Sequence, residues 1–476
     1  MRTFSFARGI FPLLVAALSL GLPAAGAAPE LPSTPAGRVL AGYLEAVNSG
    51  NKDKLEAFVK AHRPNRPDAL DRMVDLRWNN GEFDLYSVES SQTLNIQAVL
   101  REREGYGHYH RMSVSVNDGE PSVIMNITLT LIPPPAGAPI PGRLAQRAAA
   151  AAWVAEIDKA AVAGKFSGVW LWAKNGKVIA SGARGKADRE AGIENTLRTR
   201  FRIGSMNKMF TAVATLQLVE RGKLSLDDTI GKILPDYPNT NLAAKVRIRH
   251  LLSHTGGTGD IFGPEFETHR LELRTLQDYV NLYGKRDLQF EPGAKWEYSN
   301  YGFLMLGVLI EKVSGKSYYD FVAENIYKPA RMTDTGSEPE SVAVANRSKG
   351  YMRDRFEMIS NESTLPWRGT SAGGGYTTAA DLMKFADALM ANKLLKAGTL
   401  AEATRSQFTT GDYGFGFQTG RTDGPRSYGH GGSAPGMNGI LRVYPESGQS
   451  VIVLCNLDNP SAERMGDWLH IRMPIK

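Results

Sequence analysis

The 476-residue chain has 56 lysines and arginines against 49 aspartates and glutamates, a net charge of +7, and 42% of its residues are hydrophobic. This composition excludes a disordered or fibrous protein, and the length allows more than one domain. No basic block interleaved with aromatic residues stands out, so the mild positive charge does not indicate nucleic-acid binding.

The N-terminal segment has the features of a secretory signal. Arg2 and Arg8 precede an apolar run over residues 9–22, and the small residues 24–28 follow it. This order of charge, apolar run and small residues is typical of a cleaved signal peptide. We therefore predict that residues 1–27 are removed and that the protein is exported, either to the periplasm or out of the cell. No later apolar run is long enough to predict stable membrane insertion.

Residues 28–132 predict a small α+β domain. Apolar residues recur at helical spacing over 33–62 and 68–78. The pattern then changes to strict alternation, which predicts strands over residues 94–100, 112–116 and 123–131. Helices followed by an antiparallel sheet resemble, in layout only, the small cone-shaped domains of the nuclear-transport-factor-2-like type. This segment has no catalytic constellation, which leaves substrate restriction, docking of an unidentified partner and a purely structural role open.

Residues 133–143 contain five prolines and predict a semi-rigid linker, so a domain boundary falls there. The second domain, 144–476, begins with a predicted helix over 148–163. Strands are predicted over 168–173, 177–182, 413–418, 428–431, 438–444 and 450–454, with a last helix over 462–472. Because early and late strands flank a helical middle, we predict one shared antiparallel sheet, a separate helical lobe and a site between them.

The stretch Phe201–Phe210 opens a predicted buried helix that runs to Val219. Ser205 falls in its first turn, where the backbone N–H has no intrahelical partner and can donate to an oxyanion. Lys208 follows three residues later and lies on the same face. An amine beside a hydroxyl is the arrangement that an activated serine nucleophile needs in the absence of a Ser-His-Asp triad.

Two short patterns in the chain have competing matches. Ser49-Gly50-Asn51-Lys52 also reads Ser-x-x-Lys, but it lies in a polar break between helices and favours a structural role. Tyr298-Ser299-Asn300 is preferred over Tyr237-Pro238-Asn239 because it precedes an apolar helix, whereas Pro238 makes the other a turn. The amide of Asn300 is suited either to bind a substrate carbonyl or to orient the amine of Lys208.

A histidine followed by small residues occurs at His254-Thr255-Gly256 and at His430-Gly431-Gly432. The first ends a predicted helix, whereas the second falls among predicted strands, so we choose His430 as the active-site residue. Its two glycines allow close backbone approach to a ligand, and the N–H of Ser433 then offers a second oxyanion donor.

In this order the three elements resemble the serine β-lactamase and D-Ala-D-Ala peptidase superfamily, specifically its class C-like branch of penicillin-recognising serine hydrolases. The resemblance runs from about Ala148 to the C-terminus and implies a two-lobe α+β β-lactamase-like fold. It implies Ser205 as the acylated nucleophile, with Lys208 and Tyr298 sharing the work of general base; which of the two is the base stays open. It further implies an oxyanion hole made by the backbone N–H groups of Ser205 and Ser433, and substrate binding by Asn300, His430, Gly431 and Gly432.

One departure from the family pattern bears on the substrate. True class C β-lactamases have Lys-Thr-Gly at the third element, so His430-Gly431 replaces a fixed cation and loses a hydroxyl. This weakens the expected grip on a substrate carboxylate. It favours a peptidase or esterase acting on an amide or ester, such as a D-amino-acid peptide derived from the cell wall, over β-lactam hydrolysis. The alternative is a penicillin-binding-like sensor without efficient turnover.

No cofactor or metal is predicted. His250 and His254 are four residues apart but lack the glutamate of a helical zinc motif, and His108 and His110 have no third ligand near them in the sequence. The glycines at 373–375 are not followed by Lys-Ser or Lys-Thr and so do not form a phosphate loop.

Overall fold

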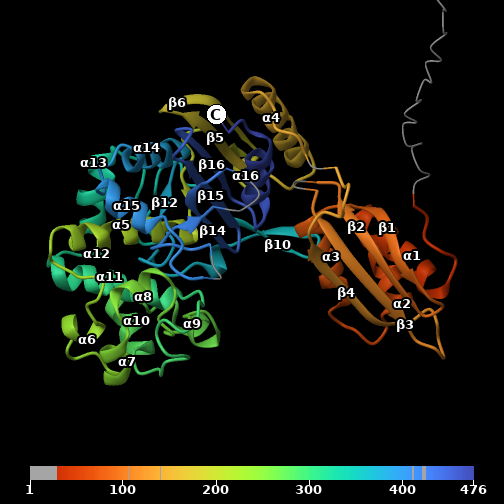
Figure 1. The fold of residues 1–476 in the computed structure, drawn as a ribbon, viewed down its shortest axis with the longest axis horizontal. Helices are drawn as coiled ribbons and strands as arrows, with labels where there is room; N and C mark the ends of the chain where they lie inside the picture. The colour runs from red at the N-terminus through yellow and green to blue at the C-terminus, as the bar shows by residue number, and fades with distance from the viewer. Residues whose placement is uncertain (1–28, 105–106, 140, 410–411, 421–424, 476) are drawn as a thin grey trace, which may run out of the picture.

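The computed structural model describes residues 29–104, 107–139, 141–409, 412–420 and 425–475. The predicted signal peptide, 1–27, lies outside these residues, so export stays a prediction. Figure 1 shows a smaller domain built from the N-terminal part of the chain beside a larger domain built from the rest.

The smaller domain packs three helices against one face of a four-stranded antiparallel sheet with the strand order β1-β2-β3-β4. Thr34 caps the first helix and Gly50, in a left-handed conformation, ends it. The elements are α1 (Pro35–Ser49), α2 (Lys52–His62), α3 (Ala69–Asn80), β1 (Phe83–Ser91), β2 (Asn95–Glu102), β3 (Tyr109–Val116) and β4 (Ile124–Ile132). The predicted α+β layout is confirmed, while the likeness to nuclear transport factor 2 stays a prediction.

Strand β1 is absent from the sequence prediction. Its pairing with β2 shifts register between Leu85 and Ser87 and again between Val88 and Ser90. Such irregularities interrupt the alternation of buried and exposed side chains, and after the buried Phe83 the residues of this strand are partly buried or exposed. The period-two signal on which the other three strands were predicted is therefore missing here.

The larger domain is organised on a six-stranded antiparallel sheet with the order β13-β14-β15-β16-β5-β6. Its strands are β5 (Gly168–Lys174), β6 (Lys177–Arg184), β13 (Gln418–Thr419), β14 (Tyr428–Ala434), β15 (Met437–Tyr444) and β16 (Gln449–Cys455). The first strand of the early pair, β5, is bonded directly to the last strand of the chain, β16. The prediction that early and late strands share one sheet is therefore confirmed.

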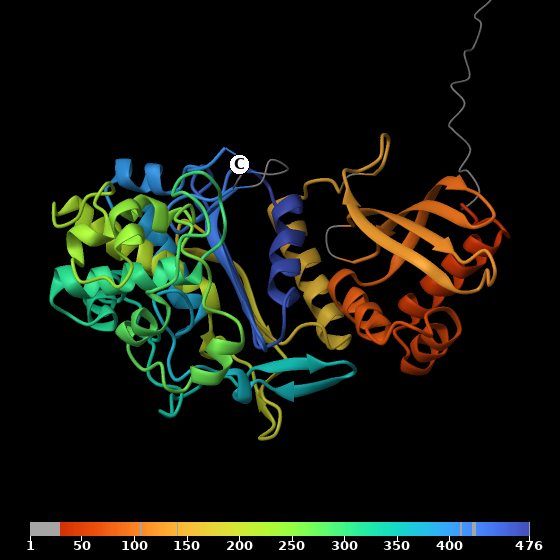
Figure 2. The ribbon, with the colours of Figure 1, turned by 90° about the horizontal axis from the view of Figure 1, so that it is seen from below.

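Alternate residues of the central strands face opposite layers. On β16, Ile452 and Leu454 pack toward the helical lobe, whereas Val451 and Val453 pack toward α4 (Gln146–Val162) and α16 (Ser461–Arg472). Figure 2 shows α4 and α16 side by side on the face of the sheet that looks toward the smaller domain. The two-lobe β-lactamase-like fold predicted for this domain is confirmed.

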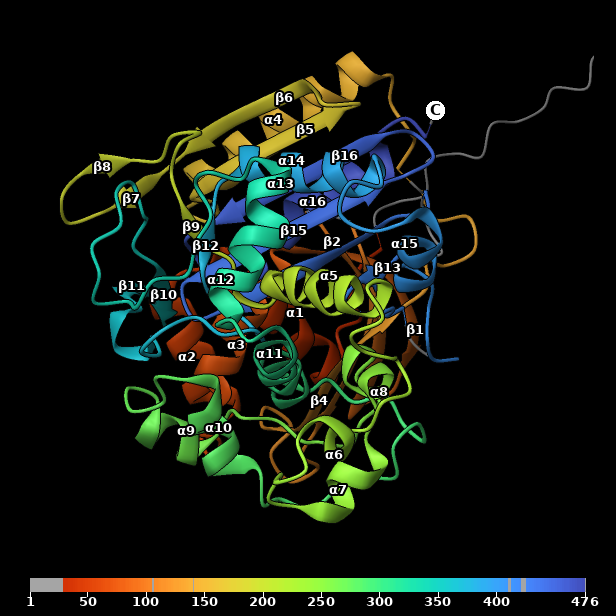
Figure 3. The same ribbon diagram turned by 90° about the vertical axis from the view of Figure 1, so that its left-hand side faces the viewer.

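The helical lobe covers the opposite face, with α5 (Asn207–Glu220) next to the sheet (Figure 3). Its residues from Asn207 to Leu218 are all buried, as the long apolar run predicts. The remaining helices are α6 (Ile230–Ile233), α7 (Thr240–Lys245), α8 (Ile248–Leu252), α9 (Pro264–His269), α10 (Leu276–Tyr283), α11 (Asn300–Ser314), α12 (Tyr318–Val322), α13 (Lys328–Ala330), α14 (Ala379–Met390) and α15 (Ala397–Ala403).

Several short strands lie outside the main sheet: β7 (Lys186–Asp188), β8 (Ile193–Glu194), β9 (Phe201–Arg202), β10 (Tyr351–Asp354), β11 (Glu357–Ser360) and β12 (Tyr376–Thr377). The hairpin formed by β10 and β11 projects from the larger domain toward the helices of the smaller one (Figure 2). No helix among the described residues has the length and apolar character needed to cross a membrane.

The strand predicted over 413–418 is wrong. Only Gln418 and Thr419 form a strand. The preceding amides bond elsewhere, since Phe415 N–H donates to Ala403 and Gly416 N–H donates to Leu252. Gly416 has a φ of 73°, which a strand does not accommodate.

Candidate active site

Ser205 lies in a short 3-10 turn, Gly204–Met206, that leads directly into α5. The regular α-helix therefore begins two residues later than predicted, with Ser205 still in the first turn of the helical segment. Gly204 has a φ of 50°, and a Cβ placed on it would lie 3.1 Å from the backbone nitrogen of Ser433. This close approach brings the backbone of Ser433 next to Ser205.

Lys208 is fully buried and its amine is held by three oxygen atoms. The Nζ atom lies 3.1 Å from Ser205 Oγ, 2.7 Å from Asn300 Oδ1 and 2.5 Å from the carbonyl oxygen of Ala372. The amide and carbonyl oxygens accept hydrogen bonds only, and both are neutral. When the lysine is uncharged, its two N–H bonds go to these acceptors and its lone pair is directed at the hydroxyl of Ser205.

Electrostatics distinguish the two candidate bases. Burial lowers the pKa of Lys208 from 10.5 to about 7, and the charge of Asp260 offsets only part of that effect. Burial raises the pKa of Tyr298 above its usual value of 10, although a hydrogen bond with Ser205 acts in the opposite direction. The desolvation of both groups favours their neutral forms. Near neutral pH, Lys208 is therefore able to accept a proton, whereas the hydroxyl of Tyr298 keeps its proton.

Asn300 is the first residue of α11, and its amide links Lys208 to Asp260. Its Oδ1 accepts from Lys208, while its Nδ2 donates to both carboxylate oxygens of Asp260 at 3.0 Å. The amide orientation is thereby fixed with its oxygen toward the amine. Of the two roles that the sequence left open, the geometry supports the orientation of Lys208, and Asn300 also lines the adjacent cavity.

Asp260 was not identified from the sequence. It follows Gly259 in the loop after α8 and lies 40 positions from Asn300. No local pattern marks it, because its role arises from a tertiary contact. The only indirect indication was Asn300 itself: when such an amide is buried, its N–H groups need an acceptor, which Asp260 provides.

Tyr298 packs close to the amine, with Lys208 Nζ 4.7 Å from the centre of its ring. His254 also reaches this site, because its ring lies 4.3 Å from that of Tyr298 and its Nδ1 accepts from the backbone N–H of Ser299. From the sequence, His430 was preferred to His254 as the active-site histidine. The structure places both histidines near the site, and His254 supports the Tyr298-Ser299-Asn300 segment.

His430 does not have the position that substrate binding through its ring requires. Its side chain is buried, Nε2 is 2.9 Å from the hydroxyl of Tyr413 and Nδ1 is 2.5 Å from the carbonyl oxygen of Gly431. Burial and the nearby Lys208 lower its pKa to about 3, so the ring is uncharged at neutral pH. The expectation that the His430 side chain grips substrate is therefore corrected, because both ring nitrogens already have protein partners.

The two glycines after His430 act through their backbone. A Cβ on Gly432 would lie 1.9 Å from the carbonyl oxygen of Ile203, so only glycine lets β14 approach the segment before Ser205 this closely. At Gly431, the N–H donates to Gln418 Oε1. Neither glycine lines the cavity beside Ser205, whereas the next residue, Ser433, does.

A cavity of about 410 Å³ opens beside Ser205. Ser205, Asn300 and Ser433 line one part of it. Most of the remaining wall is apolar, and its larger apolar side chains are Ile261, Phe262, Phe266, Leu365, Pro366 and Met437. Its charged lining residues are Glu267 and Arg368. Such a cavity suits a mainly apolar ligand that presents a few polar groups.

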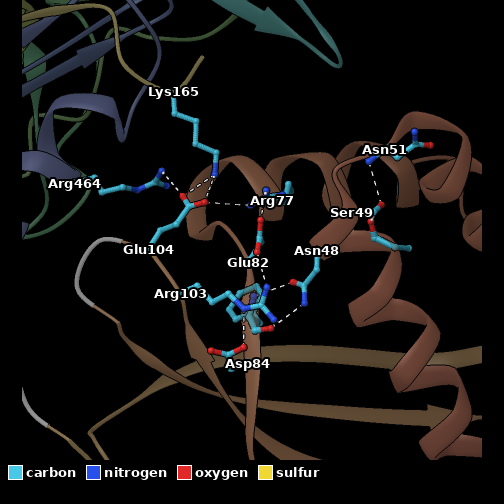
Figure 4. A network of polar contacts seen from close by, with 12 residues as sticks. Asn48, Ser49, Asn51, Arg77, Glu82, Asp84, Arg103, Glu104, Lys165 and Arg464 are labelled. Carbon is cyan, nitrogen blue, oxygen red and sulfur yellow. Dashed lines mark hydrogen bonds and ion pairs between the residues drawn. The ribbon is translucent and has the colours of Figure 1, made fainter. Parts of the chain in front are cut away.

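The competing Ser-x-x-Lys match has a different environment. Ser49 Oγ donates to the carbonyl of Ala46 and accepts from the N–H of Asn51, so it links the end of α1 to the start of α2 (Figure 4). The Lys52 amine lies 3.9 Å from Glu56 at the surface. Among the described residues, no group of three or more His, Cys, Asp or Glu side chains is arranged to hold a metal ion.

The family model described as Beta-lactamase matches residues 151–473, which are most of the chain, and the chain therefore belongs to this family of serine hydrolases. The match leaves out the smaller domain.

Three proteins illustrate the range of the relatives. Esterase EstB of Burkholderia gladioli is 30% identical over 338 residues, which cover 60% of this chain and 85% of that protein. The structure of a penicillin-binding protein from Bacillus halodurans is 33% identical with a TM-score of 0.60 and covers 65% of this chain and 98% of the other. The structure of a D-stereospecific amidohydrolase from Streptomyces sp. is 29% identical with a TM-score of 0.56 and covers 66% and 96%.

Proposed function

We propose that the protein is an exported serine hydrolase that cleaves amides or esters through an acyl-enzyme on Ser205. The observation that carries this proposal is the buried amine of Lys208, which lies 3.1 Å from Ser205 Oγ and is held by two neutral acceptors. If Ser205 only capped the helix, its hydroxyl would need no buried amine beside it. A neutral amine aimed at the hydroxyl is required only if the serine loses its proton.

The acylation step follows from this geometry. Ser205 Oγ attacks the carbonyl carbon of the substrate while its proton passes to Lys208 Nζ, and the carbonyl π electrons move to the oxygen. The backbone N–H groups of Ser205 and Ser433 donate to that oxyanion. When the tetrahedral intermediate collapses, the bond to the leaving amine or alcohol breaks and the leaving group takes the proton back from Lys208.

Deacylation repeats these transfers with water as the nucleophile. Lys208 accepts a proton from the attacking water, and Ser205 Oγ leaves the acyl carbon and recovers that proton. Tyr298, with its raised pKa, keeps its proton and is hydrogen-bonded to Ser205, so it can donate this proton to the leaving group while the proton held by Lys208 replaces it. This assignment makes Lys208 the general base and Tyr298 a proton relay.

The substrate class that fits the cavity is an amide or ester with an apolar acyl group, such as a D-amino-acid peptide or amide from the cell wall. The apolar wall supports this choice, as do the relatives named as an esterase and a D-stereospecific amidohydrolase. Because the uncharged His430 supplies no cation for a carboxylate, we rank β-lactams below these substrates. The features of residues 1–27 support export.

The test is time-resolved mass spectrometry of the purified mature protein after addition of a fluorophosphonate, a D-amino-acid amide, an ester and a labelled penicillin. We expect a fluorophosphonate adduct on Ser205, and a transient adduct with product release for an amide or ester. A persistent adduct without product from every substrate would support the alternative, a penicillin-binding-like sensor. Absence of any adduct on Ser205 would exclude both.

A further inference from the structure

The smaller domain contacts a segment of the larger one that lies just before and at the start of α16. The indole N–H of Trp78, near the end of α3, donates to the carbonyl oxygen of Asn459 at 2.9 Å. In the opposite direction, the guanidinium of Arg464 donates to the carbonyl oxygens of Trp78 and Asn79 at 2.8 Å. These carbonyls belong to the C-terminal end of α3, where a cation is favoured by the helix dipole.

A partly buried ionic cluster reinforces this contact (Figure 4). The carboxylate of Glu104, in the smaller domain, forms ion pairs with Lys165 at 2.7 Å and Arg464 at 3.3 Å, both from the larger domain. It also pairs with Arg77 of α3 at 3.4 Å. All four side chains are at most 20% exposed. The docked end of α3 is therefore fixed against residues 459–464 by both neutral and charged hydrogen bonds.

From that segment, a first connection runs to the residues after Ser433. Asp458 is adjacent to Asn459, and its Oδ1 accepts the N–H of Gly436 at 2.7 Å. Its other oxygen, Oδ2, accepts the N–H of Arg353 at 2.6 Å, so it also holds the β10–β11 hairpin. Gly436 lies in the turn between β14 and β15 that follows Ser433, and its neighbour Pro435 lines the cavity.

A second connection runs to the residue before Ser433. The side-chain oxygen of Asn438 accepts the N–H groups of Ala462 and Glu463 at the start of α16, and its Nδ2 donates to the carbonyl oxygen of Gly432 at 3.1 Å. Asn438 is also the register partner of Ser433 across the sheet. The segment that α3 contacts therefore holds the chain on both sides of the proposed oxyanion donor.

We propose that the smaller domain is an intramolecular brace for the oxyanion hole, with Trp78, Asp458 and Asn438 as positioning residues that act through the backbone of Ser433. This inference rests on the proposed role of Ser433 in acylation. Removal of one oxyanion donor costs on the order of 100-fold or more in kcat, so partial loosening of a donor has a measurable effect while the protein remains folded. The brace gives residues 28–132 a function that needs no catalytic group of their own.

The experiment uses the full-length mature chain with the double substitution Trp78→Phe and Arg464→Met, which removes the hydrogen bonds between α3 and residues 459–464, together with the ion pair of Arg464 with Glu104, but leaves the active-site residues intact. The matched control is Trp172→Phe, which removes an indole N–H bond of 2.8 Å to Gln449 elsewhere in the sheet. The burst rate with p-nitrophenyl acetate, the thermal midpoint and hydrogen exchange in the peptide covering 432–437 are measured for each.

We expect the double variant, at a temperature where it is fully folded, to acylate about tenfold more slowly, with faster exchange over 432–437. The control should lose stability but acylate at the wild-type rate. If the double variant acylates at the wild-type rate, or slows without any change in exchange over 432–437, the brace is wrong. If the wild-type protein gives no burst and no adduct on Ser205, the proposed function fails instead.

Discussion

The active site and the domain interface each contain a lysine shielded from solvent, fully in the first and partly in the second, but they surround it with different partners. Lys208 contacts a serine hydroxyl, a side-chain amide and a backbone carbonyl, none of them charged. Lys165, at the interface, contacts both oxygens of the Glu104 carboxylate at 3.0 and 2.7 Å. Burial lowers the pKa of both amines, to about 7 for Lys208 and to about 8 for Lys165.

The difference lies in the charge of the first contact. The carboxylate of Glu104 keeps Lys165 ionised, so that this lysine binds two domains together. The carboxylate that influences Lys208, that of Asp260, is hydrogen-bonded to the far side of the Asn300 amide and not to the amine itself. The amide of Asn300, which lies between Lys208 and a carboxylate, is therefore what distinguishes the two sites: Lys208 can act as a base, whereas Lys165 holds the two domains together.

The largest effect is expected for Ser205→Ala. Because the substitution removes only the attacking hydroxyl, kcat should fall by roughly 1,000-fold or more while the thermal midpoint stays close to that of the wild type. The matched control is Ser49→Ala in the competing Ser-x-x-Lys sequence, which should keep full activity. A Ser205→Ala protein that is active, or one that loses much of its stability, would instead support a capping role for this serine.

The next effect concerns the position of the negative charge. In the wild type, Lys208 must be neutral to act as a base, so kcat/KM should rise with pH through about 7 and level off above it. The double substitution Asn300→Asp and Asp260→Asn moves the carboxylate into direct contact with the amine. Since an adjacent opposite charge raises a lysine pKa, the midpoint should move up by at least about 1 pH unit.

The pH–rate profile of each protein is the measurement for this exchange. The single variant Asp260→Asn is its control: it removes the negative charge that raises the pKa of Lys208, so its midpoint should fall. An unchanged midpoint in the double variant would mean that Lys208 is not the titrating base.

A smaller effect, on stability rather than on the pH dependence of the reaction, is expected at the interface. Glu104→Gln leaves Lys165, Arg464 and Arg77 without their shared carboxylate, so the free energy of unfolding should fall by about 2 kcal/mol, less than for a fully buried pair. The pH midpoint of kcat/KM should remain near 7, because Lys208 is untouched. Chemical denaturation measures the loss of stability, and the pH–rate profile measures the midpoint. A shifted midpoint would contradict the conclusion that Lys165 and Lys208 have independent roles.

Much of this arrangement follows from the sequence because the relevant signals are local. The helix that begins after Ser205 is marked by an apolar run. The turn that joins β5 to β6 is marked by Asn175-Gly176, a residue pair suited to the positive φ angles that both adopt. Ser205, Lys208, Tyr298 and Asn300 were identified from short spacings and their flanking elements, and the structure brings these four residues together.

What the sequence left undetermined depends on tertiary contacts. Asp260 becomes significant only because Asn300 turns its donor side toward it. The orientation of His430 was missed because strand placement does not reveal which partners a ring finds, and Tyr413 and Gly431 occupy both of its nitrogens. The contact between Trp78 and Asn459 joins residues 381 positions apart and has no local signature.

The smallest effect is expected at His430, a buried group near the site that could carry a positive charge. Its ring is uncharged and bonded to protein groups, so it should contribute little to the recognition of a substrate carboxylate. In His430→Gln, the ratio of kcat/KM for a D-peptide ester with a free carboxylate to that for its methyl ester should therefore stay within about twofold of the wild type. Arg368→Met is the reference variant, because it removes a cation that lines the cavity, and it should lower the same ratio. A large fall in the ratio for His430→Gln alone would show that this histidine becomes charged and reaches the substrate. A buried group at the active site would then form an ion pair, as Lys165 does at the domain interface.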